Sequence, residues 1–539
     1  MRLLGRAKVV GITRARSQEG AVLNSCRTGD EGRAGAVVVD VGTDQHQALQ
    51  RAERKVRAYG KALLALASLL CLSVCGNLVS SAVSLLVFKE FRGAILHGGH
   101  RSVVLFDSNA ATPVDTPASV PGLKRCAVAA SGPEACWELA DPAMTEIPDE
   151  FMHGNSDITG TLRVGPAVNI ITAGAFANSR LTGLDLSKAT SLVEIRDGAF
   201  SASNLEGMLV IPANVTKIGK AAFQGTKLSS LDLSKAISLV SIGDRAFSDT
   251  GLEGTLVIPA NVAMIGPFAF AGAVDNTKKL TGLDLSKAAS LVEIGDGAFS
   301  ATALKGTLVI PATVRTIGVS AFQGTRLMGL DLSKATSLVQ ISAWAFYGTD
   351  LQGTLMIPAT LTVIGDSAFQ NAKLTRLNLS EATALVEIGD HAFYGTGLEG
   401  TLVIPAKVTT IGPFAFAGAG DYTKLTGLDL SKATSLVEIR DGAFSATNLE
   451  GTLVIPANVT MIGNAAFQDT KLSSLDLSKA ASLVSIGSRG AFSSADLLEG
   501  KLVIPATTTA IGDSAFYDTN FYDPAFYDSA FYDSHQVTT

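Results

Sequence analysis

Residues 181–227 read LTGLDLSKATSLVEIRDGAFSASNLEGMLVIPANVTKIGKAAFQGTK and contain two related units. The first, residues 181–204, has the order L-x-x-L-D-L, L-V-x-I and A-F, and we call it an LDL unit. The second, residues 205–227, has the order L-x-G-x-L-V-I-P, V-x-x-I-G and A-F, and we call it a VIP unit. The two units alternate from near residue 158 to near residue 520, so this part of the chain is a repeat array.

Each unit carries apolar residues two positions apart, such as Leu184 and Leu186 or Leu209 and Ile211. A period of two predicts a short strand with one buried face, and equivalent strands one repeat apart are expected to stack into a parallel sheet. A lone unit cannot bury its leucines, so stability must come from neighbouring units. Every unit also contributes one phenylalanine to a predicted core column: Phe176, Phe200, Phe223, Phe247, Phe270, Phe299, Phe322, Phe346, Phe369, Phe393, Phe416, Phe444, Phe467, Phe492 and Phe516.

The order I-x-x-x-A-F followed by L-x-x-L-x-I-P resembles the BspA-like subclass of leucine-rich repeats. The resemblance extends over roughly 370 residues, and a pattern repeated this often is specific. It implies a right-handed leucine-rich-repeat solenoid with a parallel β-sheet on one face. It also implies a protein on a cell surface that binds proteins or extracellular matrix.

Residues 62–88 form an uncharged apolar run. About 27 residues at about 1.5 Å per residue are long enough to cross a hydrocarbon core of about 30 Å, so we expect one transmembrane helix before the array. Residues 1–61 are rich in Arg and Lys and lack a sustained apolar period, which predicts a basic, mostly disordered head. Because cationic residues flank the cytosolic end of membrane helices, the head is expected in the cytosol and the repeats on the opposite side.

Residues 89–140 contain several prolines among Ser, Thr and Ala, which predicts an extracytoplasmic stalk. Cys126 and Cys136 within it either form one local disulfide, if they face an oxidising compartment, or are free thiols. Residues 141–520 are assigned to the solenoid. Residues 521–539, in which AFYD recurs, form an aromatic and acidic tail.

The residue between the two apolar positions of each strand is expected to point outward. We call these positions the partner face, because partner binding must come from exposed positions that vary. Stacking in sequence order predicts acidic and apolar rows that alternate about every 4.8 Å. Such rows would accept a Lys- and Arg-rich ligand or hold calcium weakly, although a solvated sheet with no ligand explains the same pattern. The partner face comprises Asp185, Val210, Asp232, Val257, Asp284, Val309, Asp331, Met356, Asn378, Val403, Asp429, Val454 and Asp476.

No catalytic motif or metal-ligand spacing interrupts the repeats, so the sequence predicts no enzyme activity, no cofactor and no metal site. Asn214, Asn378 and Asn458 lie in N-x-S/T sequons and are glycosylation acceptors if the array is lumenal or extracellular. The formal net charge is −6, and a basic head on an acidic body argues against a nucleic-acid partner.

The sequence therefore predicts a single-pass plasma-membrane protein whose extracellular array binds a protein or matrix ligand. An endomembrane protein with lumenal repeats fits the same topology. The alternative function is a structural coat or membrane scaffold that associates with copies of itself. Both alternatives predict the same fold.

Overall fold

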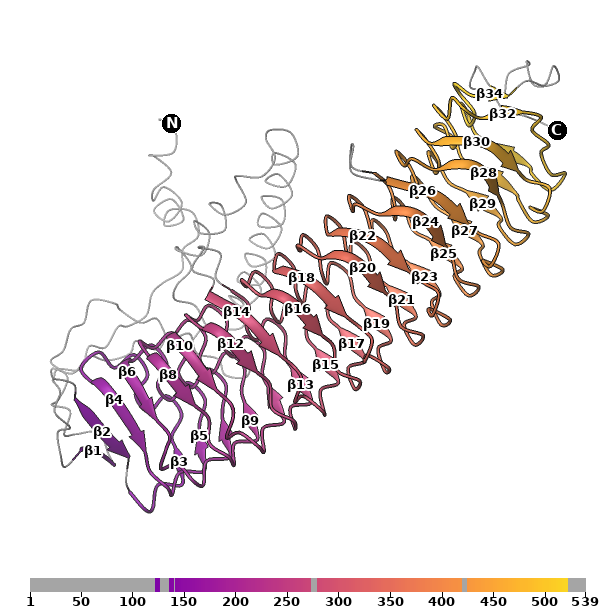
Figure 1. The fold of residues 1–539 in the computed structure, drawn as a ribbon. Coiled ribbons are helices and arrows are strands. Elements are labelled where there is room, and N and C mark those ends of the chain that lie inside the picture. Colours follow the sequence, from indigo (N-terminus) through magenta and orange to yellow (C-terminus); the bar gives the residue numbers. More distant parts are fainter. Residues whose placement is uncertain (1–121, 127–134, 140, 273–278, 419–423, 522–539) are drawn as a thin grey trace, which may run out of the picture. The chain divides into compact units, whose positions relative to one another are not determined.

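The structure is a computed structural model that describes residues 122–126, 135–139, 141–272, 279–418 and 424–521. Every regular element in these ranges is a β-strand, and the strands follow one another in sequence order (Figure 1). None of the described residues forms a helix of the length and hydrophobicity that crossing a bilayer requires. The predicted head, the predicted membrane helix at 62–88 and the tail from residue 522 lie outside the described residues.

One sheet runs along the whole array and contains sixteen parallel strands of two residues each. Every strand ends in an isoleucine, and the preceding residue lies on the other face of the sheet. The buried isoleucines form one wall of the core, as the period of two predicts. The strands are β3 (Glu146–Ile147), β5 (Ile170–Ile171), β7 (Glu194–Ile195), β9 (Lys217–Ile218), β11 (Ser241–Ile242), β13 (Met264–Ile265), β15 (Glu293–Ile294), β17 (Thr316–Ile317), β19 (Gln340–Ile341), β21 (Val363–Ile364), β23 (Glu387–Ile388), β25 (Thr410–Ile411), β27 (Glu438–Ile439), β29 (Met461–Ile462), β31 (Ser485–Ile486) and β33 (Ala510–Ile511).

The other strands come from the L-D-L and L-V-I-P segments, and most of them are five or six residues long. Apart from a four-stranded sheet at the N-terminal end, β1-β2-β4-β6, they form separate two-stranded sheets. These strands are β1 (Leu123–Arg125), β2 (Cys136–Leu139), β4 (Thr159–Val164), β6 (Arg180–Asp185), β8 (Glu206–Val210), β10 (Lys227–Asp232), β12 (Glu253–Val257), β14 (Lys279–Asp284), β16 (Lys305–Val309), β18 (Arg326–Asp331), β20 (Gln352–Met356), β22 (Lys373–Asn378), β24 (Glu399–Val403), β26 (Lys424–Asp429), β28 (Glu450–Val454), β30 (Lys471–Asp476), β32 (Glu499–Gly500) and β34 (Asn520–Phe521).

The prediction of one continuous sheet from these segments is therefore wrong. Each VIP strand pairs with the LDL strand that follows it, as β8 does with β10, but the next VIP strand, β12, starts a new pair. The physical reason lies in strand length: β10 has six residues against five in β8, and a bulge between Leu228 and Ser230 absorbs the extra residue. A bulge bends its strand and disturbs the ladder, which accounts for the break on the far edge of each LDL strand.

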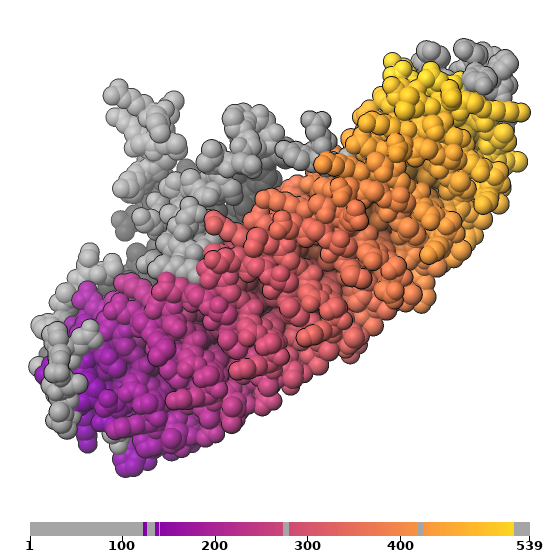
Figure 2. All heavy atoms as spheres, in the orientation of Figure 1, coloured from indigo at the N-terminus to yellow at the C-terminus, as the bar shows by residue number. Residues whose placement is uncertain are grey.

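The predicted phenylalanine column is confirmed as core. Twelve of its side chains are less than 2 % exposed, and neighbouring rings stack with centroids 5.0–5.4 Å apart and interplanar angles of 4–8°. Phe151 meets the first ring edge-on and Phe521 meets the last one edge-on. Figure 2 shows the side chains of successive turns packed without an open channel on the face in view.

The folded array begins before residue 141, within the segment predicted to be a stalk. Strand β2 pairs in parallel with β4, so it extends the first turn of the solenoid. Trp137 on β2 is buried, and its indole N–H donates a hydrogen bond to the Thr159 carbonyl at 2.8 Å. A disulfide joins Cys126 to Cys136 and holds β1 against β2, with 5.4 Å between the two Cα atoms. These residues cover the N-terminal end of the core.

Candidate functional site

The partner-face residues lie at the carboxyl ends of the paired strands. Within a pair, an apolar residue stands beside an acidic one, because Val210 pairs with Asp232 and Val257 pairs with Asp284. The same register repeats in the other pairs, including Met356 beside Asn378. The predicted alternation of apolar and acidic residues therefore holds in the pairs from β8–β10 to β28–β30, apart from the uncharged Asn378, but no ladder carries it from one pair to the next. Asp185 differs, because it stands beside Arg163 and forms an ion pair with it at 2.9 Å.

The aspartates of the partner face also cap the turn that follows their strand. Asp232 Oδ1 accepts a hydrogen bond from the Ser234 N–H at 2.8 Å, and hydrogen bonds from the Ser234 side chain and backbone lower the pKa of Asp232. Asn378 Oδ1 makes the same contact with the Ser380 N–H at 2.9 Å. The equivalent acceptors are Asp185, Asp284, Asp331, Asp429 and Asp476. These side chains thus have a structural role that the sequence reasoning missed, and the D-x-S spacing was its signal.

The apolar members of the partner face differ in exposure. Met356 is 55 % exposed, and Val257 and Val309 are exposed, whereas Val403 and Val454 are half-buried. Leu184, which was expected to share the buried face with Leu186, is only partly buried, as are most of its counterparts in other LDL units, whereas Leu475 is buried. The bulge accounts for this difference, because it shifts the side-chain alternation in the middle of the LDL strand.

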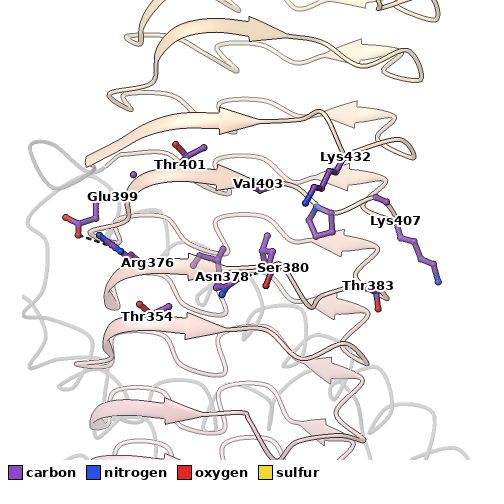
Figure 3. Close-up of a pocket in the computed structure, with 15 residues that line it drawn as sticks. Thr354, Arg376, Asn378, Ser380, Thr383, Glu399, Thr401, Val403, Lys407 and Lys432 are labelled. Atoms are coloured by element: carbon purple, nitrogen blue, oxygen red, sulfur yellow. Dashed lines mark hydrogen bonds and ion pairs between the residues drawn. The ribbon is translucent and has the colours of Figure 1, made fainter.

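Two grooves lie where one strand pair ends and the next begins. The first, groove A, has a volume of about 930 Å³ and is lined by residues of β22 and β24, with Asn378 on one side and Val403 on the other (Figure 3). The second, groove B, has a volume of about 770 Å³ and is lined in the same way by Asp429 and Val454. The breaks in the sheet thus create concave sites that a continuous sheet would lack, and partner-face residues line both.

Groove A carries charge at both ends. The Arg376 guanidinium lies 3.7 Å from the Glu399 carboxylate at one end, and Lys407 and Lys432 lie toward the other (Figure 3). Asn378 lies between them and contributes no charge. An exposed ion pair such as Arg376–Glu399 adds little to stability, so its side chains remain available to a ligand.

The sequon asparagines are exposed or half-buried, and each side chain makes a hydrogen bond. The Asn214 amide donates to the Thr190 carbonyl at 2.6 Å, and the Asn458 amide donates to the Thr434 carbonyl at 2.5 Å. Both bonds connect successive turns of the solenoid. Glycan attachment at either position would leave one N–H on the amide nitrogen, and this N–H could still donate to the carbonyl of the preceding turn.

Several exposed apolar residues lie outside the partner face. The valine before each short strand of several LDL units is exposed, and the sequence L-V-x-I placed it between two buried apolar residues. Trp344, 48 % exposed, has a φ of 59°, in the left-handed region. Among the described residues, no group of three His, Cys, Asp or Glu side chains could hold a metal ion. The exposed valines are Val193, Val240, Val292, Val386, Val437 and Val484.

Comparisons with known proteins agree with this geometry. The model of the BspA type leucine rich repeat region matches residues 145–277, 292–423 and 420–532, with six copies. A search of curated proteins returned no match.

Solved structures similar to this chain include the pneumococcal vaccine antigen PcpA. That structure is 20 % identical, with a TM-score of 0.34, and the match covers 74 % of this chain and 96 % of PcpA. A leucine-rich repeat protein from Bacteroides ovatus is 19 % identical, with a TM-score of 0.35 and coverage of 69 % and 80 %. One from Eubacterium ventriosum is 20 % identical, with a TM-score of 0.27 and coverage of 71 % and 83 %. The repeats and the family match, which covers more than half of the chain, identify the protein as a member of the BspA type leucine-rich-repeat family.

Proposed function

We propose that this protein recognises a protein or extracellular-matrix ligand through the grooves of its partner face, without catalysis. The observation that carries the proposal is that partner-face residues line both grooves A and B. A concave site with apolar walls and a few polar groups is typical of binding surfaces. Leucine-rich-repeat solenoids are typically binding scaffolds, which supports the same function.

We further propose a single-pass membrane protein with residues 62–88 as its anchor, the head in the cytosol and the repeats outside the cell or in an endomembrane lumen. The charge pattern of residues 1–88 supports this orientation. The disulfide between Cys126 and Cys136 supports an oxidising environment for the array, because disulfides persist there.

The binding function is tested by replacing partner-face aspartates with asparagine. Asparagine is the suitable substitute because Asn378 already makes the same turn-capping bond. We expect the variant with Asp232, Asp284, Asp331 and Asp429 replaced to fold normally and to bind cells or matrix more weakly than the natural chain; of these residues, Asp429 lines groove B. Both proteins are produced without glycosylation, because each substitution creates an N-L-S sequon. Unchanged binding by a folded variant would remove the acidic rows from the proposed site.

The topology is tested separately on intact cells that carry a copy tagged at the C-terminus. Protease added outside should remove the tag, and glycosidase should change the mobility of the protein if Asn214 or Asn458 is glycosylated. Repeats that carry no glycan, resist protease on intact cells and are digested when protease is added to sealed microsomes would contradict an extracellular or lumenal array. Self-association of the purified chain, with no binding to cells or matrix, would instead favour the coat or scaffold function.

A further inference from the structure

Grooves A and B have the same construction, and their differences are confined to a few side chains. Ser380, Thr383, Thr401 and Pro405 of groove A correspond to Ser431, Thr434, Thr452 and Pro456 of groove B. Lys432 corresponds to Lys479 in the same way. Comparison of the two grooves therefore isolates the chemistry that is particular to groove A.

Three positions distinguish the grooves, and all three change charge in the same direction. Groove A has Arg376 where the following LDL unit has Gly427, and Asn378 where groove B has Asp429. It also has Lys407 where groove B has Asn458. Groove A is thus lined by three cations and one anion, whereas groove B is lined by one of each. The same turn carries Glu381 in place of the lysine of other LDL units, but Glu381 does not line the groove.

The cations of groove A are available to a ligand. Arg376, Lys407 and Lys432 are all exposed. Asn378 keeps the turn-capping hydrogen bond to Ser380 while it removes the negative charge that an aspartate would place in the middle of the groove. The substitution therefore changes the electrostatic potential of the groove without loss of the local structure.

The walls of groove A suit a peptide main chain. Strand β22 pairs with β20, and β24 pairs with β26, so the two edges that face each other across the groove belong to different sheets. Strands β22 and β24 lie too close together for a further strand to insert between them. Groove A runs from Arg376 and Glu399 at one end to Lys407 and Lys432 at the other (Figure 3), so an extended segment lying along it can place acidic side chains against these cations. This favours an extended peptide over a glycan as the occupant.

We infer that groove A binds an acidic segment of a protein partner in an extended conformation, and that groove B lacks this preference. The inference rests on the proposed binding function and adds the chemical class of the ligand. Its selectivity comes from the Arg376, Asn378 and Lys407 positions.

The test uses a fully randomised nonapeptide display library and the full-length chain, produced without glycosylation so that Asn378 is unmodified. The variant N378D/K407N gives groove A the residues of groove B at two of the three distinguishing positions and leaves Arg376 in place, and both substitutions occur naturally in sister units. We expect peptides selected on the natural chain to be strongly acidic, and their affinity to fall about 5- to 10-fold in N378D/K407N, since two charges change at an exposed site. The reverse variant D429N/N458K should gain acidic binding at groove B.

Several outcomes would overturn the inference. These are selected peptides without excess acidic residues, no enrichment of any peptide, or equal affinity of acidic peptides for the natural chain and N378D/K407N. Binding of a sulfated glycan in place of peptides, or a change in self-association alone, would assign groove A to a different occupant. If the Asp→Asn variant loses cell binding while N378D/K407N keeps its peptide preference, only this inference is refuted. If the Asp→Asn variant binds cells normally while N378D/K407N binds acidic peptides more weakly, the role of the acidic rows is refuted.

Discussion

Removal of one ring from the middle of the phenylalanine column tests how the array is held together. Phe322 is fully buried, and its ring centroid lies 5.4 Å from that of Phe299 and 5.3 Å from that of Phe346. The neighbouring rings are fixed by their own turns, so Phe322→Ala leaves a cavity that cannot collapse. A buried Phe→Ala change costs about 3–5 kcal/mol of unfolding free energy.

The position of the cavity adds a second expectation. Repeat arrays are stabilised by each unit and by its interfaces with two neighbours, so Phe322→Ala weakens two interfaces near the middle of the array. We expect unfolding in urea to separate into two transitions. The chain has two tryptophans, and Trp137 lies at the N-terminal end while Trp344 lies in a central turn. Trp344→Phe leaves Trp137 as the only reporter and introduces the residue that Phe268 natively supplies at the equivalent position.

A matched control is Tyr347→Gln, because sister units have Gln323 and Gln370 at this position. We expect this surface change to alter the unfolding free energy by less than about 0.5 kcal/mol. Fluorescence and circular dichroism followed together would show whether the two transitions coincide. If the unfolding free energy of Phe322→Ala stays within about 1 kcal/mol of that of the natural chain, the phenylalanine column is not the principal core, and the expected cost of a large-to-small core substitution does not apply.

Three further perturbations test other parts of the fold. Hydrogen bonds in the folded state lower the pKa values of Asp232, Asp284 and Asp331. The ionised carboxylates therefore stabilise the fold above their unfolded pKa of about 3.9, and this stabilisation is lost as pH falls through the folded pKa. Below pH 4 the melting temperature of the Asp→Asn variant should fall less steeply with pH than that of the natural chain, and equal slopes would contradict this cause. A Cβ at Gly318 would lie 2.6 Å from backbone atoms of the preceding turn, so Gly318→Ala should cost about 1–3 kcal/mol in a urea titration, and a neutral effect would show that the turns can separate. Replacement of Cys126 and Cys136 by serine should reduce the local unfolding free energy of the N-terminal end by about 2–3 kcal/mol. The urea midpoint reported by Trp137 should therefore fall while the midpoint reported by Trp344 stays unchanged; equal shifts of both midpoints would show that the N-terminal end stabilises the whole array.

The sequence was sufficient for the repeat solenoid and its core because both follow from local periodicity. Buried residues recur at fixed positions in every unit, and a column such as Phe200 and Phe223 needs only that units stack in order. The continuous sheet of x-Ile dipeptides was harder to predict, since strands of two residues carry almost no period of their own.

The break between strand pairs was not predicted, because it depends on register between neighbouring units. LDL strands are one residue longer than VIP strands, and the sequence alone does not say whether a bulge, a loop or a shift absorbs the difference. The side-by-side position of Val210 and Asp232 follows from the sequence order of the units. The arrangement of partner-face residues around grooves A and B could not be foreseen, because each of these grooves lies where the ladder stops, between β22 and β24 and between β26 and β28.

The pairing of the long strands also determines how such an array can change in length. Removal or duplication of one VIP unit together with the following LDL unit recreates the junctions already present, with each acidic residue still beside an apolar one. Loss of one VIP unit would instead bring two LDL units together and place aspartate near aspartate, an arrangement that like charges disfavour. Loss of one LDL unit would leave a VIP strand without the LDL strand with which it pairs. Arrays can therefore lengthen or shorten by whole pairs with little change in fold, and each added pair brings another junction whose exposed residues are free to diverge.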